Sequence, residues 1–283
     1  MTGSPGHVVV APDKFKGSLT AAEVGAAVRT GLLAVRPALD VRVLPVADGG
    51  DGTLDAAVSA GFQRVPVTVS GPVGAPTEAA IAVRDAVAVV ELALASGLVL
   101  LPVDRLEPLA ASSFGTGQLI AAALDRGCLR IVLGVGGSAC TDGGAGMLQA
   151  LGARFLDAHG RDLPRGGGPL LDLATVDLAA LDPRLAGVDF VLASDVDNPL
   201  LGPRGAAHVY GPQKGASPQD VELLDAALAK LAAAWDPVAA EAPGAGAAGG
   251  VGYAALAVLH ATPRSGIDVV LDLVAFDSAL GGA

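Results

Sequence analysis

Positive charge is scarce in this chain of 283 residues. Lysine and arginine together number 18 against 29 aspartate and glutamate residues, which gives a formal net charge of −11. A nucleic acid or an anionic membrane would gain little from such a surface, because neither counterion release nor surface attraction favours binding. We therefore expect a small-molecule partner, no nucleic acid and no membrane. Whether the chain forms a homo-oligomer is left open.

Cysteine, histidine and aromatic residues are also few. Cys128 and Cys140 lack metal-ligand spacing, and two cysteines do not make a secreted disulfide scaffold. The four histidines show no paired spacing, which argues against a zinc site. No charged-then-apolar leader begins at Met1, and the longest apolar stretch, residues 86–101, is too short for a membrane span. We expect a soluble, cytoplasmic protein with free thiols. With 3% aromatic residues, its core must be aliphatic.

No Gly-Lys dipeptide occurs in the chain, which excludes the Walker-type phosphate loop of NTPases. Instead, a strand-like run at 129–133 leads into crowded glycines at 134–146. Without Cβ atoms, such a loop lets backbone N–H groups converge on an anion, and its hydroxyl and carboxylate groups suit phosphate and metal. We expect a phosphate cradle here. Its candidate residues are Gly136, Gly137, Ser138, Thr141 and Asp142.

Two other interpretations of this loop stay open. One is a wide turn between a strand and a helix. The other is the dinucleotide fingerprint, since Gly134-x-Gly136-x-x-Ala139 follows a strand and Asp157 lies roughly the right distance downstream. The fingerprint should open directly into a helix, whereas residues 140–144 prolong the loop. A nicotinamide-dependent oxidoreductase is therefore kept as the alternative function.

Lysine is used sparingly, at four positions among 18 basic residues. Lys14, Lys16 and Lys214 stand in short loops that contain glycine, whereas Lys230 lies in a helical pattern. A chain that otherwise relies on arginine keeps lysine where a compact, mobile point charge is needed, as against a phosphoryl group. We expect the three loop lysines to face an anion, and Lys230 to be solvated on the polar side of its helix.

Aspartates follow two further strand-like runs. We interpret Asp48 as functional, and Asp51 as a helix N-cap only. If the strand before Asp195 persists to Asp197, these two carboxylates point to the same face. Two carboxylates on one face repel each other unless a cation or a shared proton lies between them. The pair predicts a Mg²⁺ or acid/base site, with an Asp-rich turn as the alternative.

Strand and helix patterns alternate along most of the chain. The capping box from Thr20 to Glu23 opens a helix after a short strand. From Arg64, short alternating runs with tight connections predict antiparallel strands, and the change marks a domain boundary near Val65. Glu91, in the last of these runs, is either an inward-pointing site carboxylate or an edge charge. The βα alternation then resumes, which predicts an α/β fold.

Five segments, taken together and in this order, resemble the bacterial glycerate kinase family of the glycerate 2-kinase type. They are APDKFKGS at 11–18, PVADGG at 45–50, the glycine-rich loop at 134–146, SDVDNPLLG at 194–202 and GPQKGA at 211–216. The resemblance implies ATP- and Mg²⁺-dependent phosphorylation of D-glycerate, most often to 2-phosphoglycerate, in a cleft between two α/β lobes. A truncated, non-catalytic ligand-binding remnant is a further alternative.

The resemblance also implies how the lobes divide the chain. Residues 1–65 and 265–283 would form a Rossmann-like parallel α/β lobe. Residues 66–264 would form a second α/β lobe, with antiparallel strands, that interrupts the first.

Roles for the candidate residues follow from what phosphoryl transfer needs, which is mainly alignment and neutralised charge. We expect Asp195 to be the base that takes the substrate hydroxyl proton, Lys14 and Lys16 to bind phosphate or the glycerate carboxylate, and Lys214 to stabilise transition-state charge. We expect Asp197 and Asp48 to hold Mg²⁺, although base and metal roles could be exchanged among these aspartates. The substrate-binding candidates are Lys14, Ser18, Asp48 and Asn198.

The last residues suggest an unfinished lobe. Ile267 to Leu273 reads as a strand and Phe276 to Leu280 as the start of a further element. The resemblance implies that family members continue beyond the point matching Ala283. A parallel sheet without its terminal βα units would expose an apolar edge. We expect the 283-residue chain to be a truncated form, less stable than an extended one and weakly active or inactive.

Overall fold

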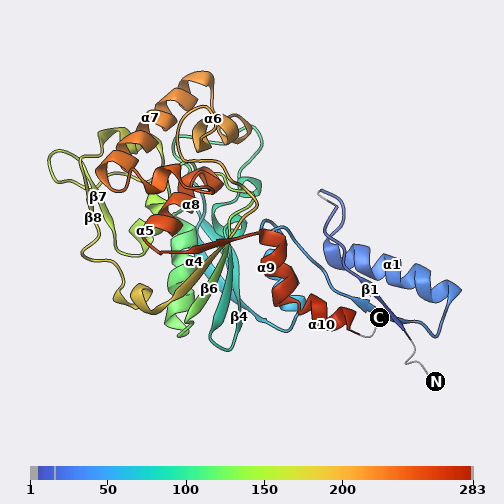
Figure 1. The fold of residues 1–283 in the computed structure, drawn as a ribbon. Helices are drawn as coiled ribbons and strands as arrows, with labels where there is room; N and C mark the ends of the chain where they lie inside the picture. The colour runs from blue at the N-terminus through green and yellow to red at the C-terminus, as the bar shows by residue number, and fades with distance from the viewer. Residues whose placement is uncertain (1–5, 16, 282–283) are drawn as a thin grey trace.

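A six-stranded sheet forms the centre of the computed structural model, which describes residues 6–15 and 17–281 (Figure 1). Its strands are β3 (Gln63–Ser70), β4 (Pro76–Arg84), β5 (Val87–Glu91), β6 (Arg130–Gly134), β9 (Asp189–Ala193) and β10 (Thr262–Arg264). Their order across the sheet is β10-β9-β6-β5-β4-β3. The first four run parallel, whereas the β5-β4 and β4-β3 pairs are antiparallel. The predicted α/β class and the antiparallel strands after Arg64 are thereby confirmed.

Helices cover both faces of this sheet. They are α2 (Thr53–Ser59), α3 (Ala93–Ser96), α4 (Phe114–Asp125), α5 (Ala145–Ala150), α6 (Ala206–Tyr210), α7 (Pro218–Ala234), α8 (Ala247–Ala257) and α9 (Gly266–Leu273). Successive residues of a strand point to opposite faces, so Ile131 and Leu133 join the large cluster with α4 to α8, whereas Val132 faces α2 and α9. A small antiparallel ribbon, β7 (Arg154–Leu156) with β8 (Thr175–Asp177), lies outside the main sheet.

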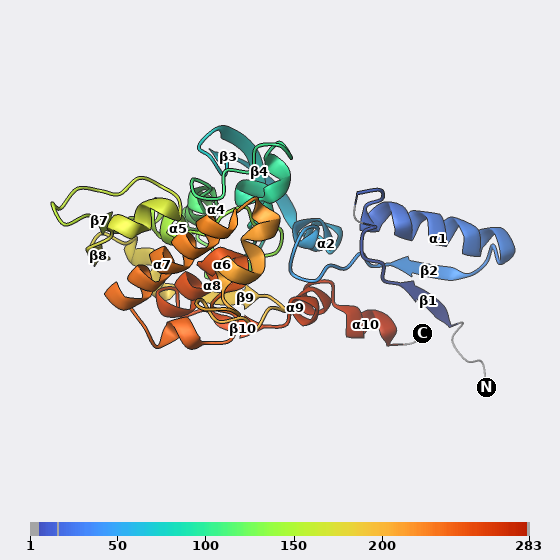
Figure 2. The same ribbon diagram turned by 90° about the horizontal axis from the view of Figure 1, so that it is seen from above.

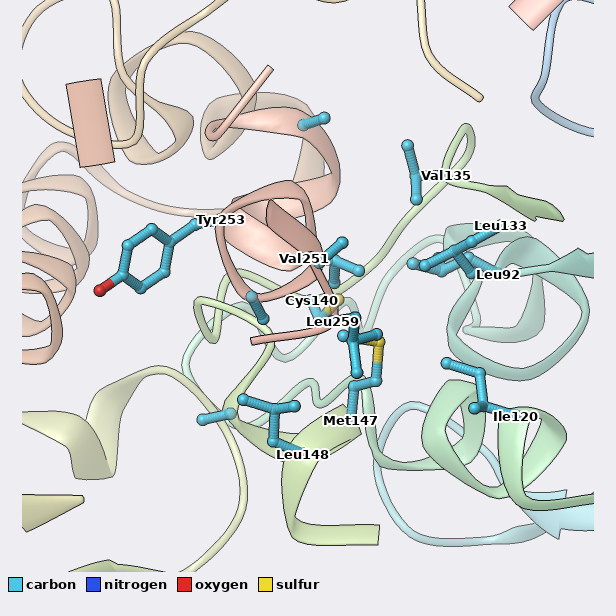
Figure 3. Packing of buried hydrophobic residues seen from close by; sticks show 14 of the residues in the cluster. Leu92, Ile120, Leu133, Val135, Cys140, Met147, Leu148, Val251, Tyr253 and Leu259 are labelled. Atoms are coloured by element: carbon cyan, nitrogen blue, oxygen red, sulfur yellow. The ribbon is translucent and has the colours of Figure 1, made fainter. Parts of the chain in front are cut away.

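The larger core is aliphatic, as the low aromatic content predicts. Figure 3 shows Cys140 beside Val251, Leu259 and Met147, in the same buried cluster as Leu92, Ile120 and Leu133. Both cysteines are buried free thiols, in agreement with the prediction from their spacing. The strand β6 and the glycine loop after it therefore start within the larger hydrophobic core.

A second, smaller unit lies beside the main body (Figure 2). It consists of two parallel strands, β1 (His7–Val10) and β2 (Asp40–Val43), with helix α1 (Ala21–Val35). The predicted capping box opens α1, because Glu23 N donates to Thr20 Oγ1 and Thr20 N donates to the Glu23 carboxylate. Helix α10 (Phe276–Leu280) reaches this unit, and His7 Nε2 lies 2.5 Å from Ala279 O.

Residues 267–273 form a helix, α9, and the prediction of a strand there is wrong. The β-branched residues of this run are typical of strands, but Ile267, Val270, Leu271 and Val274 recur at helical spacing. These four residues pack against Val46 and its neighbours in one apolar cluster. The opposite side of α9, with Val269 and Leu273, packs against the six-stranded sheet.

Helices α2 and α9 thus contact both the main sheet and the segment that follows β2. The division into residues 1–65 with 265–283 and residues 66–264 stays a prediction. In the part of the chain that the structure describes, no helix combines the length and the apolar character needed to cross a membrane.

Candidate active site

Two adjoining cavities lie at the carboxyl ends of the parallel strands, and the loop that contains Asp48 and Asp51 forms part of their walls. The first has a volume of about 350 Å³ and a polar lining that includes Asp13, Lys14, Asp48 and Asp195. Residues from four segments of the chain line both cavities and mark where they meet. These shared residues are Asp51, Val135, Gly136, Gly137, Val196 and Ala248. A ligand that extends from one cavity into the other would therefore pass over the glycines that follow β6.

The second cavity is larger, about 670 Å³, and its wall is mostly apolar. The apolar residues come from the segment after α3. They are Leu98, Val99, Leu101, Val103 and Leu106. Tyr210, Gln213 and Lys214 supply polar atoms to its wall. A flat apolar group such as a nucleobase suits this wall, and a polar chain attached to it would lead toward the first cavity.

The glycines at the junction are required by close backbone contacts. A Cβ atom on Gly136 would lie 2.4 Å from Gly50 Cα, so a larger residue at Gly136 would push the two loops apart. Gly137 has a φ of +71°, and a Cβ there would lie 2.3 Å from Asp51 Oδ1. The Gly136–Gly137 backbone can thus approach a ligand closely, which is what an anion cradle needs.

Lys14 brings positive charge to the first cavity. Its Nζ donates a hydrogen bond of 2.6 Å to the backbone oxygen of Asp51, and it lies 3.6 Å from Asp13 Oδ1. The side chain remains about a quarter exposed, at 23%, so it can still meet a ligand. The predicted site residue Lys16 lies outside the described residues. Ser18 is exposed and donates to Phe15 O, and it lines neither cavity.

Asp48 and Asp195 face the same cavity from different elements. Asp48 follows β2, and its Oδ1 accepts the N–H of Gly50 at 3.1 Å. Asp195 follows β9, and its Oδ1 accepts the N–H of Gly266 at 3.0 Å. Each carboxylate is oriented by one backbone N–H group, which comes from the same loop for Asp48 and from a residue 71 positions away for Asp195.

Asp51 is a site residue that the sequence interpretation missed. The N-cap position of α2 belongs to Gly52, and no side chain caps this helix end locally, so the interpretation of Asp51 as an N-cap is wrong. Asp51 instead lines both cavities. Its Oδ1 is buried without a hydrogen-bond partner among the described residues. Such an oxygen is costly to bury unless a ligand or cation satisfies it.

Asp197 and Asn198 lie beyond the strand and line neither cavity. Strand β9 ends at Ala193, so the condition under which Asp195 and Asp197 would share a face is not met. Asp197 is exposed. Asn198 accepts a 2.7 Å hydrogen bond from Tyr210 Oη and donates one of 2.8 Å to Arg204 O. Its amide group therefore holds the loop after β9 against α6.

The predicted cradle divides into two parts. Gly136 and Gly137 line both cavities and Ser138 lines the second. Thr141 and Asp142 are fully buried and line neither. The carboxylate of Asp142 accepts hydrogen bonds from the hydroxyls of Ser112 and Ser113 and from three backbone N–H groups. The N–H donors belong to Ser113, Gly144 and Gly146. Asp142 thus joins the starts of α4 and α5.

Lys214 is a buried cation at the wall of the second cavity, with 1% of its surface exposed. Its Nζ donates a 2.6 Å hydrogen bond to the backbone oxygen of Cys140. Burial lowers the pKa of this ammonium group, whereas neighbouring Asp142 opposes that shift. Burial also raises the pKa of the Cys140 thiol, so this cysteine has no thiolate character at neutral pH. Lys214 therefore stabilises the glycine loop through its hydrogen bond to the backbone of Cys140.

The sequence left open whether Glu91 is an inward-pointing carboxylate or a charge at the edge of the sheet. The structure shows that it points inward. The side chain is 3% exposed and lines neither cavity. It accepts hydrogen bonds from the backbone of Gly52 and Leu54. The sequence signal that marks it is a single carboxylate inside an otherwise hydrophobic strand.

The acidic residues of the first cavity suit a Mg²⁺ ion that arrives with a phosphate ligand. No preformed cluster of three or more His, Cys, Asp or Glu side chains occurs within residues 6–15 and 17–281. Mg²⁺ needs fewer, because it usually keeps several waters and is held by one or two carboxylates together with substrate phosphates. The carboxylates of Asp48 and Asp51, with the unsatisfied Oδ1 of Asp51, provide such oxygens.

Comparisons with known proteins agree on one family. The model of the glycerate kinase family matches residues 8–283. The chain is 46% identical to the glycerate kinase of Bacillus subtilis over 283 residues, which cover 98% of this chain and 74% of the relative. It is 44% identical to the glycerate 2-kinase of Escherichia coli, with 93% of this chain and 71% of the relative covered.

A solved structure supports the same assignment. The crystal structure assigned to glycerate kinase 2 from Salmonella typhimurium LT2 superposes with a TM-score of 0.91 at 43% identity, covering 99% of this chain and 77% of the other. Sequence and fold thus agree over nearly the whole chain. The protein belongs to the glycerate kinase family.

Proposed function

We propose that this protein phosphorylates D-glycerate with ATP in the two adjoining cavities, with 2-phosphoglycerate as the product. The observation that carries the proposal is the meeting of a polar and an apolar cavity over Gly136 and Gly137. Family membership supports the reaction class, and the name of the Escherichia coli relative, glycerate 2-kinase, supports the choice of hydroxyl. Nothing in these comparisons favours the nicotinamide-dependent alternative.

The shapes of the cavities suggest how the two substrates lie. The adenine ring would occupy the apolar second cavity, against the wall formed by residues 98–106. The phosphates would cross the Gly136–Gly137 backbone, where N–H groups can approach an anion closely. Glycerate would occupy the polar first cavity, with its carboxylate near Lys14. This arrangement puts the γ-phosphate at the junction of the two cavities, over the Gly136–Gly137 backbone and next to Asp51.

We assign the base to Asp195. Its carboxylate faces the first cavity, and the Gly266 N–H fixes Oδ1, so that Oδ2 can accept the proton of the substrate hydroxyl. A second aspartate of the same cavity, Asp48, is better placed for the metal because Asp51, in the same loop, also lines that cavity. The sequence left open which aspartate is the base and which holds the metal. We propose Asp195 for the base and Asp48 for the metal.

Mg²⁺, when bound with ATP, would neutralise the charge that develops on the transferring phosphoryl group. We infer that Asp48 holds the metal together with Asp51. The earlier candidate Asp197 is exposed and lines neither cavity. Lys14, whose Nζ donates to Asp51 O, would add positive charge beside Asp48 and Asp51, and Lys214 would keep the glycine loop in place through Cys140 O. Lys16 keeps its proposed role in binding phosphate or the glycerate carboxylate.

Identification of the product tests this proposal. The protein is incubated with ATP, MgCl₂ and D-glycerate, and ³¹P and ¹³C NMR are used to locate the new phosphate ester. We expect a phosphate on the hydroxyl of carbon 2. Phosphate on carbon 3 would contradict the choice of hydroxyl only, whereas binding of NADH but not ATP in a thermal-shift assay would contradict the kinase reaction itself.

A further inference from the structure

One buried carboxylate of the sheet lies next to the candidate site without lining it. Glu91 is the last residue of β5, and its backbone pairs with Gly134 of β6. Its side chain is 3% exposed. Burying an ionised carboxylate is costly unless hydrogen bonds satisfy it, so its partners indicate why it is there.

The partners of Glu91 are two backbone N–H groups at the start of α2. Oε1 accepts the N–H of Gly52 at 3.2 Å, and Oε2 accepts the N–H of Leu54 at 2.9 Å. These two residues flank Thr53 and follow directly after Asp51. Among residues 6–15 and 17–281, no other side chain caps this helix end, so both N–H groups depend on a residue 37 to 39 positions away in the sequence.

The loop that Glu91 holds carries several contacts of the candidate site. Asp48 and Asp51 face the cavities from it, and Lys14 Nζ donates to the backbone oxygen of Asp51. On its other side it lies directly on the end of β6, where a Cβ on Gly134 would be 2.6 Å from Gly49 O. A shift of the α2 start would therefore move both aspartates and Lys14 together.

We propose that Glu91 is a positioning residue for phosphoryl transfer, whose carboxylate fixes the Asp48–Gly52 loop over the junction of the two cavities. The proposal rests on the proposed function. It gives the carboxylate a role that needs both of its oxygens as acceptors, one for each N–H group. Glutamine keeps the length of the side chain but offers one acceptor in place of two, because its amide nitrogen only donates.

Glu91→Gln, Glu91→Asp and wild type are compared by steady-state kinetics with D-glycerate and ATP. Activities are normalised to the folded fraction, and hydrogen exchange of the peptide spanning residues 48–54 is followed by mass spectrometry. Glu78→Gln is the matched control, since Glu78 lies exposed on β4 of the same sheet and lines neither cavity. Glu91→Asp keeps the charge but shortens the side chain, and it serves if Glu91→Gln does not fold.

We expect Glu91→Gln to lower kcat about tenfold or more, because small displacements of positioned groups reduce rates steeply. The KM for ATP should change less than kcat does, since most residues that line the second cavity come from other segments of the chain. Exchange within residues 48–54 should become faster. The control should behave as wild type in all three measurements.

Two results would overturn the role of Glu91. One is a kcat per folded protein within about twofold of wild type for the Gln and Asp variants. The other is unchanged exchange within residues 48–54. If the wild type itself shows no turnover that depends on D-glycerate, the proposed function fails, and the exchange measurement still decides whether Glu91 holds the loop.

Discussion

Asp195 Oδ1 accepts the backbone N–H of Gly266 at 3.0 Å and so ties together the ends of two neighbouring parallel strands. Asp195 follows β9, and Gly266 opens α9 directly after β10. The contact points the carboxylate into the polar cavity and fixes which of its oxygens is engaged. A base that has to meet one substrate hydroxyl needs this kind of orientation.

Asp195→Asn should lower kcat by about 10²-fold or more, because loss of a positioned base typically costs 10²–10⁴. Asparagine keeps a carbonyl oxygen for the Gly266 N–H, so the fold should be unchanged. Steady-state kinetics with a thermal melt check both points. Asp197→Asn is the control, since Asp197 is exposed and lines neither cavity. A variant within a few-fold of wild type would remove Asp195 from the base role.

Gly136→Ala should lower kcat/KM about tenfold or more, because the new Cβ would lie 2.4 Å from Gly50 Cα and force the two loops apart. The affinity for ATP, measured by calorimetry, should fall with it. Gly187→Ala is the matched control, as no atom lies within 4 Å of a Cβ there. Equal kinetics for the two variants would show that the cavity junction tolerates displacement.

Lys14→Met should raise the KM for D-glycerate about tenfold, since Lys14 lines the polar cavity and its ammonium group would meet the substrate carboxylate. Methionine preserves most of the aliphatic stem. Lys230→Met provides the comparison, because Lys230 lies on α7 and donates to Leu171 O. If both changes alter the KM equally, the argument that loop lysines face an anion is wrong. Lys16→Ala should likewise weaken the binding of substrate or ATP more than Lys230→Ala does.

The stability of the wild type relative to Glu91→Gln should depend on pH. Burial raises the pKa of Glu91 from 4.5 to about 7, although the N–H groups of Leu54 and Gly52 oppose the shift, and Asp51 and Asp55 add to it. The folded state therefore binds this proton more tightly than the unfolded state. The resulting stability is fully present below pH 4.5 and is lost as the pH rises through about 7.

Thermal melts of both proteins between pH 8 and 5.5 measure this effect. The melting temperature of the wild type, minus that of Glu91→Gln, should increase as the pH is lowered. The full shift corresponds to about 3 kcal/mol, at 1.36 kcal/mol per pKa unit. The same difference taken for Glu78→Gln should stay flat. If the difference in melting temperature between the wild type and Glu91→Gln is also independent of pH, the pKa of Glu91 is not raised in the folded protein.

The sequence predicted local elements well where short-range chemistry decides them. The capping box at Thr20 and Glu23 and the buried run before Gly134 specify a helix start and a strand on their own. The prediction was wrong at residues 267–273, where the β-branched residues suggested a strand. These residues form a helix, and its two sides pack in two different apolar clusters. That choice depends on packing partners distant in the sequence.

The candidate site could be predicted only in part, because some of its residues are also placed by contacts with residues distant in the sequence. Lys14, Asp48, Asp195, Gly136, Gly137, Ser138 and Lys214 line the cavities as expected. The sequence could not distinguish Asp142 from a ligand-binding residue, because its partners Ser112 and Ser113 lie about 30 positions away, directly before α4. Asp51 was taken for a cap because its position before α2 fits one, whereas the cap comes from Glu91 on the sheet.

The most direct test of the account is release of ADP in a coupled assay with ATP and MgCl₂, with and without D-glycerate. We expect ADP release that requires D-glycerate, saturates with it and is lost in Asp195→Asn. ADP release that is absent, or that is the same with and without D-glycerate, would contradict the assignment of the two cavities to ATP and glycerate.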